Sequence, residues 1–174
     1  DLIVICGQHD SSEQWRGLPR ISNWIEQQIT EIRKYTTRPI LVRPHPRNTI
    51  TFDENKFTNV KVRLPKRDYR TYDDTDFKQT LERTWAVVNH SSNPAMEAVI
   101  RRVLPALGDA DRAVWRCGAA EALHRVVARM GLAVLPFAIF LVVPILGRMS
   151  DQHAAVRHTV TRCFATLLEL LPLE

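Results

Sequence analysis

The spacing of apolar residues changes class near residue 100, and this change limits what the chain can fold into. Before that point the apolar residues come in short runs separated by turn-forming residues. Beyond it they recur at helical spacing, and Ala, Leu, Val and Arg dominate. Composition changes at the same place, since no Lys follows Lys78 and no Asn follows Asn93. A pattern that switches from strand type to helix type predicts two unlike segments, residues 1–100 and 101–174.

The first segment alternates apolar runs of strand type with stretches of helical spacing. Leu2–Cys6 is an apolar run stopped by Gly7, as expected of a strand that is buried on both faces. Apolar residues then recur at helical spacing from Ile21 until the chain reaches Pro39. Strands that alternate with helices predict a parallel sheet with helices on its faces, which is a Rossmann-like α/β fold. Further strands are expected at 39–42, 60–64 and 85–88, and short helices at 77–83 and from 94 onward.

The second segment contains an internal repeat. Val103–Gly108 reappears in similar form as Val142–Gly147, 39 residues later. Each copy leads through an acidic residue to an apolar–arginine pair, which is Trp115–Arg116 in the first copy and Val156–Arg157 in the second. An amphipathic helix follows each pair. A period of about 40 residues built from two helices is typical of HEAT and armadillo arrays, so we predict an all-α, HEAT-like repeat segment.

Charge, cysteine content and hydropathy exclude several classes of function. The formal net charge is +5, but the basic residues are dispersed, so we expect a solvated surface and no direct nucleic-acid binding. Cys6, Cys117 and Cys163 form no CxxC pair, which predicts reduced thiols in an intracellular compartment and neither a zinc site nor a disulfide framework. The longest apolar run, Leu132–Leu146, is shorter than the roughly 20 residues of a bilayer span and contains two prolines. We therefore interpret it as a buried helix and expect no membrane partner.

Three loops of the first segment are expected to follow strands, at residues 7–12, 43–47 and 89–97. In open parallel sheets, ligands bind beyond the carboxyl ends of the strands. Ser91 and Ser92 lead into a helix, where free backbone N–H groups and the positive helix end suit a diphosphate. Glu97, near the start of that helix, is placed to hydrogen-bond a ribose. The same residues also fit a plain helix cap, and the sequence leaves both interpretations open.

The other two loops carry histidines. His45 lies between two prolines and is flanked by arginines, an arrangement that suits clamping a phosphate or stabilising a leaving group. A structural turn is the alternative for His45. His9 and Asp10 form a weaker candidate acid–base pair, because adjacent loop residues need not face each other. The acidic cluster Asp73–Asp76 fits either a divalent cation or a solvated helix start, so metal dependence is left open.

The order of these motifs resembles the carboxyl-terminal, donor-binding half of GT-B glycosyltransferases, particularly the capsule-polysaccharide and phage types. The resemblance rests on Arg-Pro-His-Pro-Arg at 43–47 and Asn-His-Ser-Ser-Asn-Pro-Ala-Met-Glu-Ala at 89–98, and it covers roughly residues 1–100. It implies a nucleotide-activated sugar as the ligand, a cytoplasmic location, and a catalytic position facing the phosphates for His45. The donor-binding residues that it implies are Gly7, Gln8, Arg43, His90, Ser91, Ser92, Asn93 and Glu97.

Two departures from that family argue against an intact catalyst. The sequence does not contain the acceptor-binding amino-terminal half of a GT-B enzyme. The family also continues after its last motif with a Gly-x-Pro-Val strand, whereas here Ala98–Ile100 runs into Arg101–Val103. The donor fold is therefore expected to stop short, and no cofactor beyond the sugar donor is implied.

The second segment resembles the HEAT-repeat region of the TATA-binding-protein-associated factors, which are SWI/SNF-like ATPases. The resemblance is carried by Gly147–Asp151 and Cys163–Leu167 and spans most of residues 101–174. It implies a nuclear protein whose helical array grips the TATA-binding protein, and it implies that Arg157 bridges neighbouring repeats. The segment contains no ATPase motor and fewer repeats than such a grip needs.

Three hypotheses about function follow. The main one is a partial glycosyltransferase-type module that binds a nucleotide-activated sugar and is incomplete for catalysis. The alternative is a HEAT-repeat fragment of a TATA-binding-protein regulator, which acts through protein–protein interaction. The third is an artificial or mis-assembled fusion with no activity as a whole. If the two halves are independent, limited proteolysis is expected to cut between about residues 98 and 112.

Overall fold

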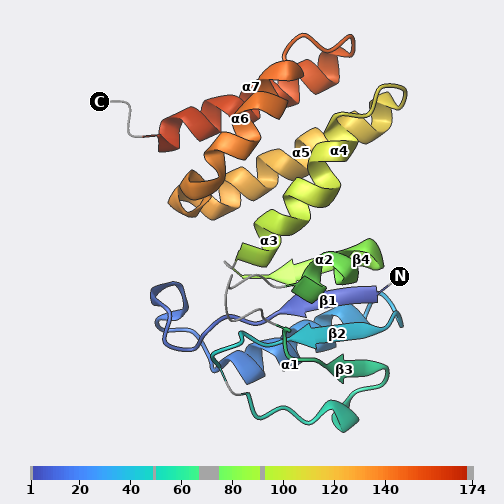
Figure 1. Cartoon of the computed structure of the whole chain (residues 1–174), viewed down its shortest axis with the longest axis vertical. Helices are drawn as coiled ribbons and strands as arrows, with labels where there is room; N and C mark the ends of the chain where they lie inside the picture. Colours follow the sequence, from blue (N-terminus) through green and yellow to red (C-terminus); the bar gives the residue numbers. More distant parts are fainter. Residues whose placement is uncertain (1, 49, 67–74, 91–92, 172–174) are drawn as a thin grey trace. The chain divides into compact units, whose positions relative to one another are not determined.

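The structure, a computed structural model, describes residues 2–48, 50–66, 75–90 and 93–171 (Figure 1). The chain divides into two compact units, Asp1–Ala95 and Met96–Glu174. The boundary between them falls a few residues before the change of sequence pattern near residue 100. We describe each unit by itself.

Among its described residues, the first unit contains a four-stranded parallel sheet with the strand order β3-β2-β1-β4. The central strand β1 (Leu2–Cys6) pairs with β2 (Ile40–Arg43) and with β4 (Thr84–Asn89). The edge strand β3 (Val60–Val62) pairs with β2. The predicted parallel sheet is confirmed, and the observed strand ends lie within two residues of the expected ones.

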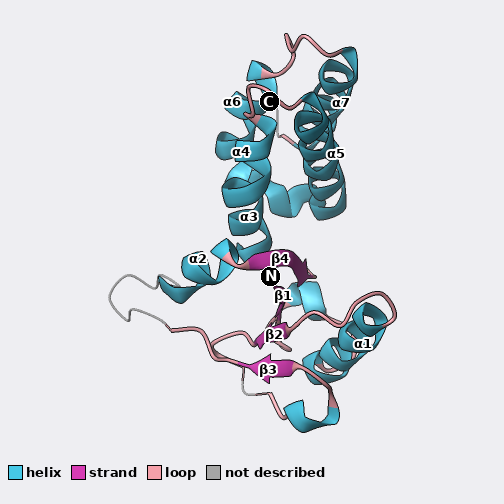
Figure 2. Ribbon diagram, turned by 90° about the vertical axis from the view of Figure 1, so that its right-hand side faces the viewer, coloured by secondary structure: helices cyan, strands magenta, loops and turns pink. Residues whose placement is uncertain are grey.

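Helices lie on both sides of this sheet, with α1 (Ile21–Arg33) on one side and α2 (Thr75–Glu82) on the other (Figure 2). The carboxylate of Asp10 accepts a hydrogen bond from the N–H of Ile21 at 2.8 Å, which satisfies a free donor at the start of α1. Apolar residues of α1 at positions i, i+4 and i+8 are buried against the sheet. The core on this side includes Ile3, Ile5, Ile21, Ile25, Ile29, Ile40 and Val42. Two short 3₁₀ turns, η1 (Glu13–Trp15) and η2 (Glu54–Lys56), complete the unit's described elements.

The second unit is all helical in its described part, as predicted, and consists of two helical hairpins (Figure 1). The first arm of the first hairpin is one continuous helical stretch, made of α3 (Asn93–Ala98), the π-helical turn η3 (Val99–Val103) and α4 (Leu104–Leu107). Its first residues, at the start of α3, belong to the first unit. The second arm is α5 (Ala113–Met130). The second hairpin consists of the 3₁₀ segment η4 (Gly131–Phe137), α6 (Ala138–Gly147) and α7 (Ala154–Leu170).

The two hairpins pack against each other mainly through α5 and α7. Each helix buries a stripe of residues spaced i, i+4, i+7 and i+11, which is the spacing of one helix face. The apolar members of both stripes belong to the same core, and no member of either stripe is more than 5% exposed. The stripe on α5 is Arg116, Ala120, Leu123 and Val127, and the stripe on α7 is Val156, Val160, Cys163 and Leu167.

The apolar run Leu132–Leu146 is only half buried, so the prediction of a buried helix is wrong for one of its faces. Its inward residues are Val134, Ala138, Leu141 and Ile145. Large side chains on the other face are exposed, at 68% for Leu132, 75% for Ile139, 54% for Phe140, 72% for Val143 and 44% for Leu146. Exposed apolar faces of this size commonly mark a surface that contacts another molecule.

The same run lies within a longer helical stretch, Ala113–Gly147, that has the length and apolar composition needed to cross a membrane, with 22% of its most apolar window buried. This stretch is not one straight helix. α5 ends at Met130, Gly131 has a φ of 53°, and the chain reverses direction before α6 (Figures 1 and 2). Beyond Met130 the stretch consists of the 3₁₀ segment Gly131–Phe137 and the ten-residue helix Ala138–Gly147, and that helix by itself extends about 15 Å at 1.5 Å per residue.

Candidate functional sites

The loops that leave β1 and β2 meet at the carboxyl edge of the sheet. Gly7 follows β1 directly, and its N–H donates a hydrogen bond to the carbonyl oxygen of Arg43 at 2.8 Å. A Cβ at Gly7 would lie 3.3 Å from the Cα of Pro44, so the close approach of the two loops favours glycine. The first two predicted loops are therefore brought together, as a ligand site at this edge requires.

Histidines from three loops lie along this edge. The ring of His9 meets the ring of His45 edge on, with their centroids 5.3 Å apart. The Nδ1 atom of His45 accepts a hydrogen bond from the N–H of Arg47 at 3.2 Å, which fixes the turn around it. The ring of His90 meets the buried ring of Trp15 at 5.0 Å. The edge thus places His45, the predicted catalytic residue, beside a second imidazole.

The guanidinium of Arg43 is engaged in a buried ion pair. Arg43 is 3% exposed, and its Nη2 and Nη1 atoms lie 2.8 Å and 3.0 Å from the two carboxylate oxygens of Asp76. The guanidinium also lies over the ring of Phe77, 5.3 Å from its centroid. Such a two-point pair is a strong, geometrically specific interaction. A phosphate contact by Arg43 would require this pair to open first.

The two members of the candidate acid–base pair are directed to different partners. Asp10 binds the start of α1 and accepts a second hydrogen bond from the Nδ2 atom of Asn48 at 3.2 Å. The same Nδ2 atom lies 3.4 Å from the carbonyl oxygen of Gln8. Gln8, a predicted ligand residue, therefore takes part in the contact between the first two loops. The Nδ1 atom of His9 faces the hydroxyl of Ser11 at 2.7 Å. Asp10 therefore has a helix-capping role in this geometry.

The remaining predicted ligand residues lie in the segment around the boundary between the two units. Glu97 belongs to the second unit, where its carboxylate pairs with the Nε atom of Arg101, four residues on. Asn93 begins α3 at the end of the first unit. Ser91 and Ser92 lie outside the described residues.

The described part of the chain contains no group of three or more His, Cys, Asp or Glu residues that could hold a metal ion. Of the acidic cluster predicted as a possible cation site, Asp76 pairs with Arg43, and Asp73 and Asp74 lie outside the described residues.

The second unit has a buried ion pair between its two hairpins. Arg116 of α5 donates from Nε and Nη2 to the two carboxylate oxygens of Asp151, at 2.8 Å and 3.1 Å. Its Nη1 atom donates to the carbonyl oxygens of Asp109 and Ala110 in the turn of its own hairpin, at 3.1 Å and 3.2 Å. The side chains are 6% and 1% exposed. The arginine therefore fixes its own turn and the turn of the next hairpin at once.

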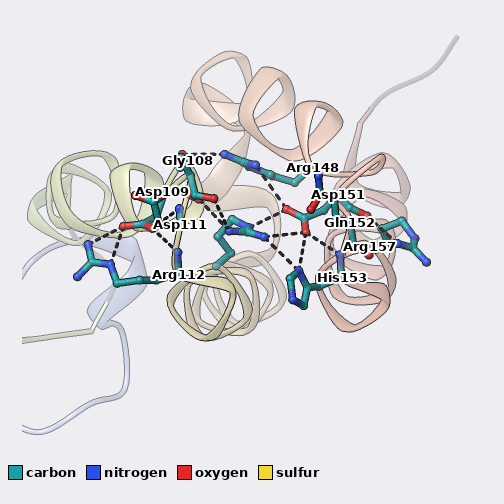
Figure 3. Close-up of polar contacts among 11 residues, drawn as sticks. Gly108, Asp109, Asp111, Arg112, Arg148, Asp151, Gln152, His153 and Arg157 are labelled. Atoms are coloured by element: carbon teal, nitrogen blue, oxygen red, sulfur yellow. Dashed lines mark hydrogen bonds and ion pairs between the residues drawn. The ribbon is translucent and has the colours of Figure 1, made fainter.

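Asp151 is the centre of this polar cluster, and Figure 3 shows it among Arg148, His153 and Arg157. Its carboxylate also accepts from the N–H of His153 at 2.9 Å and from the Nη1 atom of Arg148 at 3.4 Å. The hydrogen bonds from Arg116 lower the pKa of Asp151 from 3.8 to about 2. Burial of the carboxylate acts in the opposite direction, and the hydrogen bond from His153 and the charge of Arg148 act in the same direction as Arg116. The same pairing raises the pKa of Arg116. Both groups are thus charged throughout the physiological range.

A second contact joins the hairpins beside the ion pair. The Nη2 atom of Arg148 donates to the carbonyl oxygen of Gly108, at the end of α4, at 2.7 Å. Since Arg148 follows α6, each hairpin contributes one arginine that binds the turn of the other. The last carbonyl groups of a helix have no hydrogen-bond donor within the helix, so this contact also supplies one at the end of α4.

Arg157, for which the resemblance implied a bridge between repeats, does not make that bridge in the described residues. Its Nη1 atom donates to the carbonyl oxygens of Asp151 and Gln152, at 2.6 Å and 3.0 Å, within its own hairpin. The bridge is made by Arg116, which sequence reasoning noted only as part of the repeat. A signal for it existed, because Arg116 occupies an apolar stripe otherwise formed by Ala120, Leu123 and Val127.

Comparisons with known proteins find relatives for about half of the chain. It is similar to TATA-binding protein-associated factor mot1 of Schizosaccharomyces pombe, with 43% identity over 86 residues, or 49% of this chain. It is also similar to TATA-binding protein-associated factor 172 of Homo sapiens, with 48% identity over 79 residues, or 45% of this chain. The MOT1 protein of Saccharomyces cerevisiae is 39% identical over 99 residues, or 56% of this chain.

The matched stretches span only 4% to 5% of the length of these relatives. No family model matches the chain, and no solved structure matches it. The relatives support the resemblance of the helical half to the TATA-binding-protein-associated factors, and nothing found supports a glycosyltransferase segment. The comparisons therefore favour the alternative hypothesis over the main one.

Proposed function

We propose that the second unit is a protein-interaction module of the TATA-binding-protein-associated factor type. The observation that carries this proposal is the 43% to 48% identity to relatives of that name over about half of the chain. On this proposal the two hairpins are HEAT-like repeats, the chain binds TATA-binding protein through them, and it acts in the nucleus as part of transcription regulation. It is a binding function and requires no catalytic residue.

The geometry of the hairpins is compatible with such a role. The buried pair between Arg116 and Asp151 fixes the angle between neighbouring hairpins, because a two-point arginine–carboxylate contact has one preferred geometry. A stack of hairpins held in this way presents a rigid surface to a partner. Binding then loses little conformational entropy, which favours affinity.

The test is retention of the full chain on immobilised TATA-binding protein, with two matched variants. His45→Ala changes the sheet edge of the first unit and is expected to leave retention unchanged. Asp151→Asn weakens the contact between hairpins and is expected to reduce retention. Absence of retention of the unmodified chain would refute the proposed partner, and loss of retention in His45→Ala would move the binding surface to the first unit.

Nucleotide-sugar binding at the sheet edge stays a prediction. In its favour are the parallel sheet and the meeting of the loops around Gly7 and His45. Against it is the engagement of Arg43 by Asp76. Isothermal titration of the full chain with UDP-, CDP- and GDP-sugars decides it, since no heat with any of the three would remove the donor-site hypothesis.

A further inference from the structure

Two exposed tryptophans in the described part of the chain each lie under an arginine. In the second unit the guanidinium of Arg112 lies over the ring of Trp115, 3.6 Å from its centroid. In the first unit the guanidinium of Arg38 lies over the ring of Trp85, 5.0 Å from its centroid. The two tryptophans are 53% and 61% exposed. The two pairs are of the same chemical kind, so one can be compared with the other.

The arginine of the pair in the second unit also binds a carboxylate. The Nε and Nη2 atoms of Arg112 donate to the Oδ2 atom of Asp109, at 3.0 Å and 2.5 Å. Figure 3 shows this contact. The hydrogen bonds from Arg112 are the main reason why the pKa of Asp109 falls to about 2. An arginine that lies on a tryptophan ring therefore still has two donors for one carboxylate.

The arginine of the pair in the first unit has no carboxylate. Within the residues that the structure describes, the guanidinium of Arg38 has no acidic partner and no hydrogen-bond acceptor. Its backbone, in contrast, is held on both sides. The N–H of Arg38 donates to the hydroxyl of Thr36 at 3.2 Å, and its carbonyl oxygen accepts from Nη1 of Arg33 at 2.9 Å. The loop therefore presents a guanidinium whose donors are available and whose attachment point is fixed.

The exposure of Trp85 results from a β-bulge at the start of β4. Leu2 pairs with Thr84 and Ile3 pairs with Ala86, so no residue of β1 lies opposite Trp85. Bulges redirect side chains and are frequent beside binding sites. Because β4 is an edge strand of a parallel sheet, the ring lies near the amino ends of the strands. This edge is opposite to the one where the loops with the predicted ligand residues meet.

The charges around this pair favour a single carboxylate over a nucleic acid. Arg33 is occupied by four backbone carbonyl oxygens. Lys34 pairs with Glu31 at 2.5 Å. Arg83 precedes β4 and is adjacent to Glu82 in the sequence, so the two add no net charge. A nucleic acid is bound through several unpaired cations along its backbone, whereas one guanidinium suffices for a carboxylate.

We propose that the Trp85–Arg38 pair binds an acidic peptide segment of a partner protein. An aspartate or glutamate carboxylate of the segment binds the guanidinium, and a neighbouring apolar side chain lies on the indole ring. The contact between Arg112 and Asp109 in the second unit has the arrangement that the incoming carboxylate completes. Tryptophan and arginine are also the side chains most enriched where protein interfaces concentrate their binding energy.

This inference does not rest on the proposed function. The Trp85–Arg38 pair belongs to the first unit, whereas the proposed function assigns TATA-binding protein to the second unit. A chain that fails to bind TATA-binding protein can still bind an acidic peptide, and the reverse also holds.

The test is NMR of the ¹⁵N-labelled full chain, in which each indole N–H gives its own signal. Trp85→Phe identifies the signal of Trp85 by its loss. The probe is the acetylated and amidated peptide Gly-Glu-Phe-Glu-Gly, and Gly-Gln-Phe-Gln-Gly is its uncharged control of matched size. The signal of Trp115 is the control within the chain, because its arginine already has a carboxylate.

We expect the acidic peptide to shift the signal of Trp85 in a saturable way and to leave that of Trp115 in place. The uncharged peptide should bind on the order of tenfold more weakly. Arg38→Gln should weaken binding of the acidic peptide by a similar factor and leave binding of the uncharged one unchanged. Arg83→Gln removes a positive charge beside Trp85 in the sequence, and it should weaken binding by about twofold or less.

Several results would overturn the proposal. One is an unshifted Trp85 signal with the acidic peptide at about 1 mM, and another is equal binding of the two peptides. Equal weakening by Arg38→Gln and Arg83→Gln would show unspecific charge attraction instead. A shift of Trp85 by single-stranded oligothymidine, without one by the acidic peptide, would assign the surface to nucleic acid. The signal of the buried Trp15 reports whether Arg38→Gln is folded, and the comparison of the two peptides needs no variant.

Discussion

Replacing Asp151 by asparagine removes the negative charge that balances the buried guanidinium of Arg116. The carboxylate is 1% exposed and lies within 3.4 Å of donors from Arg116, Arg148 and His153. Asparagine keeps the size of the side chain and one acceptor oxygen. The change therefore isolates the negative charge and leaves the buried guanidinium of Arg116 without compensation.

The magnitude follows from two independent considerations. The pKa of Asp151 is lowered from 3.8 to about 2, and at 1.36 kcal/mol per unit this corresponds to about 2 kcal/mol of folding free energy. Removal of one partner of a buried ion pair costs about 3–5 kcal/mol in measured cases. We therefore expect Asp151→Asn to lower the free energy of unfolding of the second unit by about 2–4 kcal/mol.

The assay is urea unfolding of the full chain followed by circular dichroism at 222 nm, and Asp111→Asn is the matched control. Asp111 lies in the turn of the first hairpin and is exposed. Its replacement should change stability by less than about 0.5 kcal/mol. Equal effects of the two substitutions would refute the reasoning, because the buried pair would then contribute no more than a surface carboxylate.

The same pair sets a pH dependence. Because the folded-state pKa of Asp151 is below its unfolded value, the unfolded chain binds more protons in acid. The stabilisation is fully present above about pH 4 and is lost as the pH falls toward 2. Acid titration of the unmodified chain should show this loss of stability. In Asp151→Asn the stability should fall less over the same pH range, because the variant has no carboxylate at this position.

Four further predictions concern single features of the two units. Ala120→Leu should destabilise the second unit by about 1–3 kcal/mol in urea unfolding, because Ala120 is 0% exposed in the α5 stripe that packs on α7. Gly7→Ala should cost about 1 kcal/mol, since its Cβ would lie 3.3 Å from backbone of the neighbouring loop. Burial raises the pKa of Cys163 to about 11, so Ellman's reagent should titrate the half-buried Cys117 first and Cys163 only on unfolding. Limited proteolysis should spare the helical stretch Val99–Leu107 and cut in the turn after it, and cuts inside that stretch would show that the first hairpin is not formed.

The elements that sequence reasoning located well are those whose signals are local. Leu2–Cys6 was expected as a strand and is one, because a short apolar run stopped by glycine has few other ways to bury itself. The copies Val103–Gly108 and Val142–Gly147 end the first arms of two hairpins, as the repeat predicts. Both patterns depend on neighbours along the chain and not on distant contacts.

The two buried ion pairs could not be predicted, because they join residues that are far apart in the sequence. Arg43 pairs with Asp76 and Arg116 pairs with Asp151, at separations of more than thirty residues. In the sequence, Arg43 is a basic residue of a loop motif with no acidic residue near it, whereas in the fold it pairs with the carboxylate of Asp76. Likewise, the choice between Arg116 and Arg157 as the bridging residue depends on which hairpin has a neighbour to bridge to.

The apolar run Leu132–Leu146 shows a different limit. Hydropathy records how apolar a segment is, but not how many of its faces the fold covers. In this unit α6 buries Leu141 and Ile145 and leaves Ile139 and Val143 exposed. The run is therefore apolar on both faces, although the unit buries only one of them.

The central claim is that the helical unit is the part of the chain that recognises a protein partner. Hydrogen–deuterium exchange of the full chain, with and without saturating TATA-binding protein, tests it most directly. We predict slower exchange in peptides from residues 96–171 and unchanged exchange in peptides from residues 2–66. Slower exchange confined to the sheet unit, or none anywhere, would contradict the account.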